Sequence, residues 1–473
     1  MNIDFVRISA VILLFIFSSC STSQLVTLKS SEELKNVKIY TNLNEALENP
    51  SDVVILKLEN DHLTEVPKQL FKLKNLQVLY LGYNNLTELP VELNSLIKLQ
   101  KLVLRNNQFK TIPSILGQCH KLEEIDMSGN QLTEISADLY ACKAIKILKF
   151  AENKITTIAD SISKLQNLEI LDLYANQLVA LPDDVVNNLN LRRIELDNNR
   201  LSGLPEHFGR LTKLSTFNAE NNQLMALPND FGLLVDLTQL KINNNNLRQL
   251  PDNFGQLTKI DQLFLNSNQL KHLPSSIGDM LQLNLLDVSK NQLIDLPKTL
   301  ANLNNLHTLN LSNNDLTRID AATFNGTNLK ELNLSLNKIV DINGEFTNDN
   351  SIELLDMEFN KLNEIPIAFR KLTNVIILNV SRNNISELPE LLNNMDHLQI
   401  IKLSDNKIDL FSKAIKNHPT LEVIDLSDNQ VKLLPLDYAQ IIHLKKLDLS
   451  NNPIYSWHIK QLKAKFSPDV LIL

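Results

Sequence analysis

The sequence predicts an α/β solenoid, in which short coils stack so that strands line one face and helical turns the other. The first observation is the 23-residue frame L-x-x-L-x-L-x-x-N-x-L-x-x-L-P-x-x-L-x-x-L-x-x, which repeats without a change of register over residues 53–455. The second is the L-x-L pair of each coil, such as Leu171 and Leu173, whose alternation is typical of a strand. The third is the return of apolar residues three apart after the proline, as at Phe208 and Leu211, which favours a short helical turn on the opposite face.

Length and composition agree with a stacked array. A chain of 473 residues would suggest about three ordinary domains, but repeat arrays grow by stacking and need no single large core. The apolar share of 43% and charged share of 21% fit a folded chain. The net charge of −8 argues against a nucleic-acid partner, which requires a clustered basic surface.

An asparagine follows the expected strand of nearly every coil. Backbone groups are buried where the strand turns away, and such groups need hydrogen-bond partners. A side-chain amide both donates and accepts, so it can join the turns of successive coils. The first coil has Asp61 in this place. We therefore predict a structural ladder made by Asn84, Asn107, Asn130, Asn153, Asn176, Asn199, Asn222, Asn245, Asn268, Asn291, Asn314, Asn337, Asn360, Asn383, Asn406, Asn429 and Asn452.

This frame resembles the leucine-rich repeat family, and the resemblance covers residues 53–455 as eighteen tandem units. The 23-residue unit with L-P-x-x-L-x-x-L is most similar to the variety shared by bacterial leucine-rich repeat proteins and the Ras-group-type proteins. The resemblance implies a right-handed, curved α/β solenoid, or horseshoe, with a parallel sheet on its concave face. It also implies binding through that face, and it leaves the partner open.

Residues 1–20 resemble a bacterial lipoprotein signal. The apolar run from Ile8 to Phe17 is shorter than the roughly 20 residues of a membrane-spanning helix, and Phe17-Ser18-Ser19-Cys20 follows the lipobox pattern except that Phe17 replaces the usual Leu. The resemblance implies a lipid anchor at Cys20 in the cell envelope, at the outer membrane or cell surface. A cleaved secretory signal, which would give a periplasmic or secreted protein, and an uncleaved segment stay open.

Caps are expected at both ends of the array, because the terminal coils must keep their cores dry. Residues 21–52 should hold a polar tether and an N-terminal cap, with helical spacing in the segment TNLNEALENP. Residues 456–473 should form a C-terminal cap of a helix followed by a strand. We expect no catalytic domain outside the repeats, unlike the leucine-rich repeat ubiquitin ligases of some bacteria.

The cysteines and histidines predict no redox or metal site. Cys119 and Cys142 occupy the same inward slot of adjacent coils, where a spacing of about 4.8 Å exceeds the roughly 3.8 Å between the Cβ atoms of a relaxed disulfide. Two buried thiols are therefore favoured over a disulfide. The histidines lack metal-ligand spacing, and no phosphate-binding loop motif occurs, so we expect no metal and no cofactor.

Candidate binding residues depart from the repeat consensus at its outward fifth, seventh and eighth positions. Four carboxylates with one tyrosine predict an acidic patch for a basic partner or a cation, although a solvated acidic face is the alternative. Exposed aromatic and large apolar side chains on a rigid sheet can anchor an interface, although single ones are common on any surface. The acidic group is Asp172, Tyr174, Glu195, Asp197 and Glu220. The aromatic and apolar group is Tyr80, Tyr83, Phe264, Leu336 and Phe359.

The sequence therefore predicts a monomeric, non-enzymatic recognition protein that reaches the membrane only through a lipid on Cys20. Its concave sheet is expected to bind a protein or a glycan. The alternative is a structural or adhesive surface protein that binds matrix or host tissue.

Overall fold

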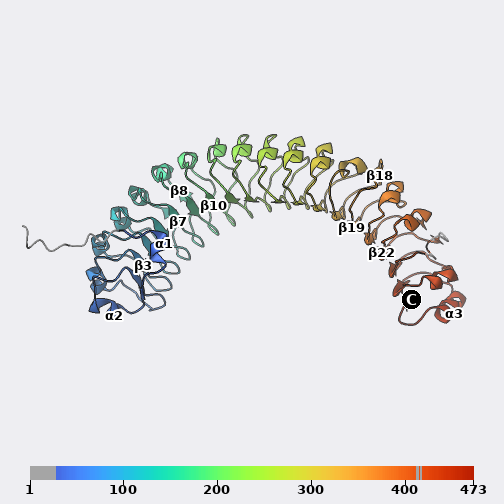
Figure 1. Cartoon of the computed structure of the whole chain (residues 1–473), viewed down its shortest axis with the longest axis horizontal. Helices are drawn as coiled ribbons and strands as arrows, with labels where there is room; N and C mark the ends of the chain where they lie inside the picture. The colour runs from blue at the N-terminus through green and yellow to red at the C-terminus, as the bar shows by residue number, and fades with distance from the viewer. Residues whose placement is uncertain (1–27, 412–414, 416–417) are drawn as a thin grey trace, which may run out of the picture.

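A computed structural model describes residues 28–411, 415 and 418–473. The described chain forms one continuous arc of coils, with a parallel sheet on the inner curve and helical turns on the outer curve (Figure 1). This architecture confirms the predicted α/β solenoid with a concave sheet. The expected signal peptide and Cys20 lie outside the described residues. Within the described ranges, no helix has both the length and the apolar character needed to cross a membrane.

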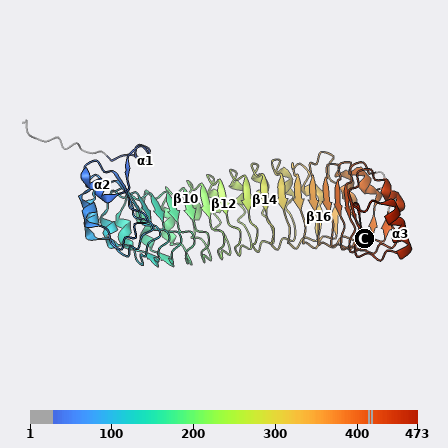
Figure 2. The ribbon, with the colours of Figure 1, turned by 90° about the horizontal axis from the view of Figure 1, so that it is seen from below.

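Every coil contributes one short strand to the concave sheet. The sheet has 20 strands in the described part of the chain, and all of its pairings are parallel, as in Leu171 beside Ile194 and Ile194 beside Phe217. The strands lie side by side along the arc (Figure 2). Their order is β1 (Ile39–Tyr40), β2 (Ile55–Lys57), β3 (Val78–Tyr80), β4 (Lys101–Val103), β5 (Glu124–Asp126), β7 (Ile147–Lys149), β9 (Ile170–Asp172), β10 (Arg193–Glu195), β11 (Thr216–Asn218), β12 (Gln239–Lys241), β13 (Gln262–Phe264), β14 (Leu285–Asp287), β15 (Thr308–Asn310), β17 (Glu331–Asn333), β19 (Leu354–Asp356), β20 (Ile377–Asn379), β22 (Ile400–Lys402), β24 (Val423–Asp425), β25 (Lys446–Asp448) and β26 (Leu471–Ile472).

The strand begins one residue before the predicted L-x-L pair. In β9, Leu171 is fully buried, whereas Ile170 and Asp172 on either side are half-buried on the concave face. The third position of the frame, counted from the first leucine of each coil, therefore also faces the concave side. It was not among the expected surface positions, because the sequence pattern shows where the leucines alternate but not where the backbone hydrogen bonds of the ladder begin.

The outer curve is built from 3-10 turns, since 23 residues leave little room for α-helix after a strand and two bends. The turns are η1 (Lys68–Lys72), η2 (Val91–Ser95), η3 (Ser114–Gln118), η4 (Ala137–Ala141), η5 (Asp160–Lys164), η6 (Asp183–Asn187), η7 (Phe208–Arg210), η8 (Phe231–Leu233), η9 (Phe254–Gln256), η10 (Ser275–Asp279), η11 (Lys298–Asn302), η12 (Ala321–Thr323), η13 (Ile367–Lys371), η14 (Glu390–Asn394) and η16 (Leu436–Gln440). The α-helices belong to the two ends: α1 (Ser31–Leu34), α2 (Leu43–Glu48) and α3 (Ser456–Lys465).

The curvature follows from unequal spacing on the two faces. Paired strands lie about 4.8 Å apart, whereas the stacked rings of Phe208, Phe231 and Phe254 in the outer turns have centroids 6.3 Å apart. The stack therefore bends toward its sheet. The outer turns still approach closely at their backbones, because a Cβ atom on Gly232 would overlap with the carbonyl oxygen of Asn253.

In the described part of the chain, three extra pairs of short strands lie on the flank of the arc, next to the slot where the frame places proline. They are β6 (Glu134–Ile135) with β8 (Thr157–Ile158), β16 (Arg318–Asp320) with β18 (Asp341–Asn343), and β21 (Glu387–Leu388) with β23 (Leu410–Phe411). Five of these six coils have a residue other than proline in the slot, such as Ser136 or Ala159. Because proline lacks the N–H group that a strand pairing needs, its loss lets neighbouring coils pair here as well.

The predicted asparagine ladder joins each coil to the one before it. In coil 8, which begins at Leu214, the Nδ2 of Asn222 donates to the carbonyl oxygens of Leu196 at 2.9 Å and Ala219 at 3.1 Å. Its Oδ1 accepts from the N–H of Leu201 at 3.0 Å. Leu196 and Leu201 belong to the preceding coil. The amide thus satisfies buried backbone groups of two coils, as the sequence suggested.

The inward cysteines are free thiols. The Sγ of Cys142 donates to the carbonyl oxygen of Leu116 at 2.7 Å. Burial raises the pKa of the Cys119 thiol to about 12 and that of Cys142 to about 11. Both thiols therefore stay protonated at neutral pH and act as small apolar side chains, which matches the favoured alternative.

The N-terminal end is more elaborate than the expected tether and helix. Besides α2, which lies in the segment with helical spacing, residues 28–38 cross the concave side of the first coils, and we call them the strap. Its helix α1 lies inside the arc beside β3 (Figure 1). Leu34 and Val37 of the strap pack with Ile55 and Val78 of the sheet. The N–H of Lys29 donates to the Oε1 of Gln77 at 2.9 Å.

The C-terminal end contains a helix, α3, and a closing strand, β26, which pairs with β25. Leu462 and Phe466 are buried against the last coil, whereas Trp457 is 55% exposed. His458 is also buried, and its Nε2 lies 2.9 Å from the carbonyl oxygen of Leu434. The histidine therefore continues the hydrogen bonding between coils beyond the last repeat.

Removing one ladder amide should loosen the coils that it joins. Asn222→Ala would leave the buried groups of Leu196, Leu201 and Ala219 without their partner, so we expect a local loss of about 2–4 kcal/mol. Native-state hydrogen exchange of the amides around coil 8 measures this loss. Gln223→Ala is the matched control, since Gln223 is exposed, and it should change local opening little. Equal exchange in both variants would contradict a structural ladder.

Candidate partner-binding surface

The predicted acidic residues meet on three successive coils of the concave sheet. Asp172 lies beside Glu195 in the ladder between β9 and β10. Two residues after Glu195, Asp197 accepts a hydrogen bond from the backbone N–H of Glu220 in the next coil at 2.7 Å. We call Asp172, Glu195, Asp197 and Glu220 the acidic cluster. Tyr174, in the same slot as Asp197 and 39% exposed, borders it.

Burial and mutual repulsion make the acidic cluster hard to ionise fully. Burial raises the pKa of Asp197 to about 6, and the carboxylates of Glu195 and Glu220 add to the shift. Burial also raises the pKa of Asp172 and of Glu195. A cation that approached this surface would favour the ionised carboxylates, so the cluster can gain electrostatic energy from a positively charged partner.

Partners within the chain offset only part of this negative charge. The guanidinium of Arg193 lies 3.6 Å from the carboxylate of Glu195. The Nδ2 of Asn218 donates to the same carboxylate at 2.6 Å. Among the described residues, no lysine or arginine forms an ion pair with Asp172, Asp197 or Glu220. The cluster therefore stays a net negative surface at neutral pH.

The two tyrosines near the N-terminus have different surroundings. Tyr80 is half-buried and packs beside Ile55 and Val78, the strand residues that the strap covers. Tyr83 is 44% exposed, and the guanidinium of Arg105 lies 5.0 Å from its ring centroid. The strap thus removes much of Tyr80 from the open surface and leaves Tyr83 accessible.

The remaining apolar candidates lie elsewhere on the arc. Phe264 is half-buried in β13, between Lys241 and Asp287 of the neighbouring strands. Leu336 and Phe359 are adjacent and exposed by 47% and 52%. Both have a left-handed backbone, with φ of 56° and 57°. A large side chain pays a steric cost there, and the same slot holds asparagine, aspartate or glycine in most coils.

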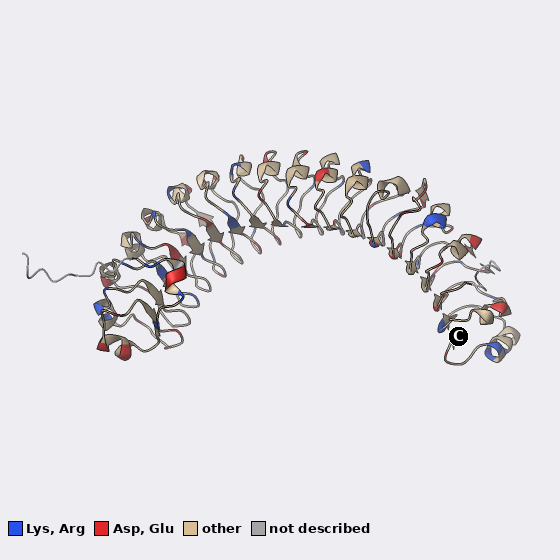
Figure 3. Cartoon of the chain, in the orientation of Figure 1, with Lys and Arg blue, Asp and Glu red and all other residues tan. Residues whose placement is uncertain are grey.

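The candidate residues therefore do not form one site. The acidic cluster with Tyr174 is contiguous, Leu336 pairs with Phe359, and Tyr83 and Phe264 stand apart. Basic and acidic residues are found along the whole arc (Figure 3). Beside the cluster runs a charge ladder that was not expected, in which Glu124 pairs with Lys101 at 3.0 Å and with Lys149 at 3.2 Å. Lys101 and Glu124 occupy the third position of the frame. This position lies on the surface because each strand begins one residue before the L-x-L pair.

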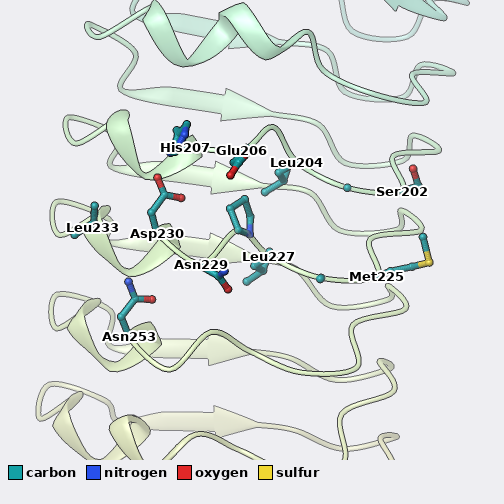
Figure 4. A pocket seen from close by; sticks show the side chains of 13 residues that line it. Ser202, Leu204, Glu206, His207, Met225, Leu227, Asn229, Asp230, Leu233 and Asn253 are labelled. Atoms are coloured by element: carbon teal, nitrogen blue, oxygen red, sulfur yellow. The ribbon is translucent and has the colours of Figure 1, made fainter.

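A shallow groove of about 730 Å³ lies on the flank of the arc (Figure 4). It forms where η7 and η8 are three residues long, in contrast to the five-residue turns of most coils. Glu206, His207 and Asp230 line it. In the described residues no group of acidic, histidine or cysteine side chains is arranged to hold a metal ion. The groove is accounted for by the shortened turns.

A second groove, of about 520 Å³, lies between the strap and the concave sheet. Leu34 and Lys35 line it on the side of the strap, and Ile39 of β1 lines it beside them. Ile55, Val78 and Ile147 of the sheet also line it, together with charged side chains such as Lys101 and Glu124. The strap therefore gives the N-terminal part of the concave face a walled channel that the repeats alone would not have.

Family models of the leucine-rich repeat match much of the chain. The "Leucine rich repeat" model matches residues 51–109, 120–178, 166–224 and 304–362. A two-copy model matches residues 97–140, and a single-repeat model matches residues 443–463. Together these matches cover more than half of the sequence, so the chain belongs to the leucine-rich repeat family. None of the curated proteins compared with the chain matches it.

Solved structures of the same fold cover nearly the whole chain. A leucine-rich repeat protein of Leptospira interrogans is 27% identical with a TM-score of 0.58, over 92% of this chain and all of that one. The Arabidopsis receptor kinase HAESA, in complex with the peptide hormone IDA and the co-receptor SERK1, is 26% identical with a TM-score of 0.52, over 87% of this chain and 85% of that one. YopM from Yersinia enterocolitica is 24% identical with a TM-score of 0.57 over the same shares, which shows a common fold.

A pH titration tests the raised pKa of Asp197 in the acidic cluster. The carboxyl of Asp197 should titrate near pH 6, because its pKa is raised to about 6 from the ordinary 3.8. Since the folded state holds the proton more tightly than the unfolded state, this group's contribution to stability falls as pH rises from about 4 to 6. Asp197→Asn should therefore stabilise the region at pH 7 and have little effect below pH of about 4.

Carboxyl-carbon chemical shifts in NMR spectra measure the titration, and hydrogen exchange at the two pH values measures the stability. Asp448 is the control within the chain, because hydrogen bonds from Ser450 and Lys446 lower its pKa against the effect of burial. It should titrate below pH 3.8. Titration of Asp197 at or below this ordinary value would contradict the electrostatic description of the cluster.

Proposed function

We propose that this protein is a non-enzymatic recognition protein of the bacterial cell envelope, held at the membrane by a lipid on Cys20 and binding a partner protein on its concave sheet. The observation that supports this most is the acidic cluster, where half-buried carboxylates from three coils gather on the concave face and Arg193 offsets only part of their charge. We infer that the bound segment of the partner is positively charged. A basic segment would stabilise the ionised form of Asp197 and neutralise its neighbours.

The family supports the proposal at a coarser level. Leucine-rich repeat proteins are in general binding scaffolds without catalytic activity. HAESA, which shares the fold at 26% identity, is described in complex with a peptide hormone and a co-receptor. A protein segment is therefore the partner class that we propose. A glycan, or matrix and host tissue, are the other classes that the sequence left open.

Photo-cross-linking in intact cells tests the binding face. A photoreactive amino acid at Tyr174, on the concave face, should capture the partner. The same amino acid at Leu233, which is 47% exposed in the outer turn η8, should not. Mass spectrometry of the cross-linked product identifies the partner. Capture from Leu233 with none from Tyr174 would exclude the concave face.

A pair of charge-matched variants tests the part played by the acidic cluster. Glu195→Gln with Asp197→Asn removes two negative charges from the concave face and should lower the cross-linking yield from Tyr174 at least about tenfold, as expected for the loss of paired charges at an interface. Asp183→Asn with Asp184→Asn removes the same charge from the exposed outer turn η6 and should leave the yield unchanged. An equal effect of both pairs would indicate a general response to net charge.

The anchor is tested separately. Cys20→Ala should abolish labelling with a radioactive or clickable fatty acid and should move the protein from the membrane fraction to the soluble fraction, because a thioether-linked lipid requires this thiol. Cys119→Ala is the control, since Cys119 is buried in the repeats. Membrane fractionation that is unchanged in Cys20→Ala would exclude the proposed anchor while leaving the concave binding face untouched.

A further inference from the structure

An apolar stripe runs across the concave sheet of coils 14–17, counted from the coil that begins at Val53. It consists of Leu354, Ile377, Ile400 and Val423, one residue from each of β19, β20, β22 and β24. The three pairings that join these strands place the four side chains directly beside one another. All four are half-buried on the surface of the sheet, whereas the leucine or isoleucine after each is buried in the core.

At the N-terminal end of the sheet, the same slot also holds apolar residues, and there a segment of the chain covers them. Ile55 and Val78 hold this slot in the first two coils, and they are only 5% and 3% exposed. Their cover is the strap, whose Leu34 and Val37 pack on them. This sheet therefore already packs against one short amphipathic segment that lies across its strands. Within the described residues, no segment of the chain covers the apolar stripe of coils 14–17.

The charged side chains beside the apolar stripe indicate what kind of segment would bind there. The outward positions beside it in coils 14–17, which are the second, fifth, seventh and eighth of each frame, hold seven carboxylates and two cations: Glu353, Asp356, Glu358, Asp405, Glu422, Asp425, Asp428, Arg382 and Lys402. Ion pairs tie four of the carboxylates to cations. Glu353 pairs with Lys330 and Glu422 with Lys445, both in the flanking coils, and Arg382 of coil 15 pairs with Glu358 and Asp405.

Asp356 and Asp425 are the carboxylates nearest the stripe along the strands, because each lies two residues after a stripe residue on the same face. Among the described residues, neither forms an ion pair with a lysine or arginine. Each instead accepts hydrogen bonds from its own coil, Asp356 from the N–H of Glu358 at 2.9 Å and Asp425 from the hydroxyl of Ser427 at 2.7 Å. Both can still receive a cation from outside.

We propose that the apolar stripe is the docking site for a cationic amphipathic segment of a partner protein, with apolar side chains on the stripe and lysine or arginine side chains toward Asp356 and Asp425. The strap of a second copy is not the occupant, because in each copy it already covers Ile55 and Val78. At about 4.8 Å per strand the stripe is roughly 14 Å long, which matches about ten residues of helix. This inference rests on the proposed concave binding face and adds a second contact area to the acidic cluster.

Peptide binding to the purified protein tests the proposal. The probe is a synthetic amphipathic peptide of leucine and lysine with about ten residues, the helix length that matches the stripe. It should bind measurably, with affinity that falls as salt rises. A serine–lysine peptide of equal charge lacks the apolar face, and a leucine–glutamate peptide has the opposite charge, so both should bind at least about tenfold more weakly, a difference of about 1.4 kcal/mol.

Matched variants locate the binding. Ile377→Thr with Ile400→Thr keeps the β-branched side chains that suit a strand and should weaken binding of the leucine–lysine peptide at least about tenfold. Leu285→Thr is the control, since Leu285 has the same slot and a similar half-buried state in coil 11. Circular dichroism and thermal unfolding verify the fold. If the stripe variant is unstable, Asp356→Asn with Asp425→Asn provides a second test that leaves the stripe intact and should also weaken binding.

Two outcomes would overturn the proposal. One is equal affinity of the leucine–lysine peptide for the wild-type protein and for the stripe and charge variants. The other is equal affinity for the leucine–lysine and serine–lysine peptides, which would show that charge alone is recognised. Cross-links from the peptide to coils 6–8 would relocate the contact to the acidic cluster. Each of these results would leave the capture of a partner from Tyr174 standing, so the failure of this inference is distinct from the failure of the proposed function.

Discussion

Every other feature of this protein depends on the side-chain amide that joins one coil to the next. A coil of 23 residues has too few backbone partners of its own at the bend after its strand. The amide of Asn222 gives two buried carbonyl oxygens and one buried N–H a partner, and it does so across the boundary between coils. Repeating this contact fixes the relative position of successive coils. The sheet then stays in register over the full arc, and surface residues 23 apart in sequence become neighbours.

Unequal spacing on the two faces converts that register into a curved recognition surface. The inner strands keep the separation that their hydrogen bonds require, while outer side chains such as Phe231 hold the turns further apart. Residues on the inner curve are therefore drawn together. This explains why the carboxylates of three coils are half-buried and repel one another, with the pKa of Asp197 raised to about 6. The same crowding makes a row of four aliphatic side chains across neighbouring strands a continuous apolar stripe.

The concave face is divided along its length. The strap covers the first coils and walls a groove, the acidic cluster occupies coils 6–8, and the apolar stripe occupies coils 14–17. A long partner could contact more than one of these areas, and two weak contacts joined by one chain bind far more tightly than either alone. The division also explains why the candidate residues did not converge on one site: in a solenoid, distance along the chain becomes distance along the arc, so only residues a few coils apart can meet.

The sequence by itself determined the repeat, the inward leucines, the ladder of asparagines and the neighbours within the acidic cluster, because a fixed period assigns each residue a slot and each slot a direction. It also favoured free thiols at Cys119 and Cys142, which the structure contains. Only the tertiary structure decided where each strand begins, and hence that the third position is surface and that Leu354, Ile377, Ile400 and Val423 form a stripe. It alone placed the strap across the concave face and buried His458 in the C-terminal cap. The physical reason is that periodicity reports contacts repeated in every coil, whereas the start of a strand, the path of a terminal segment and the cover on a surface depend on single contacts between distant parts of the chain.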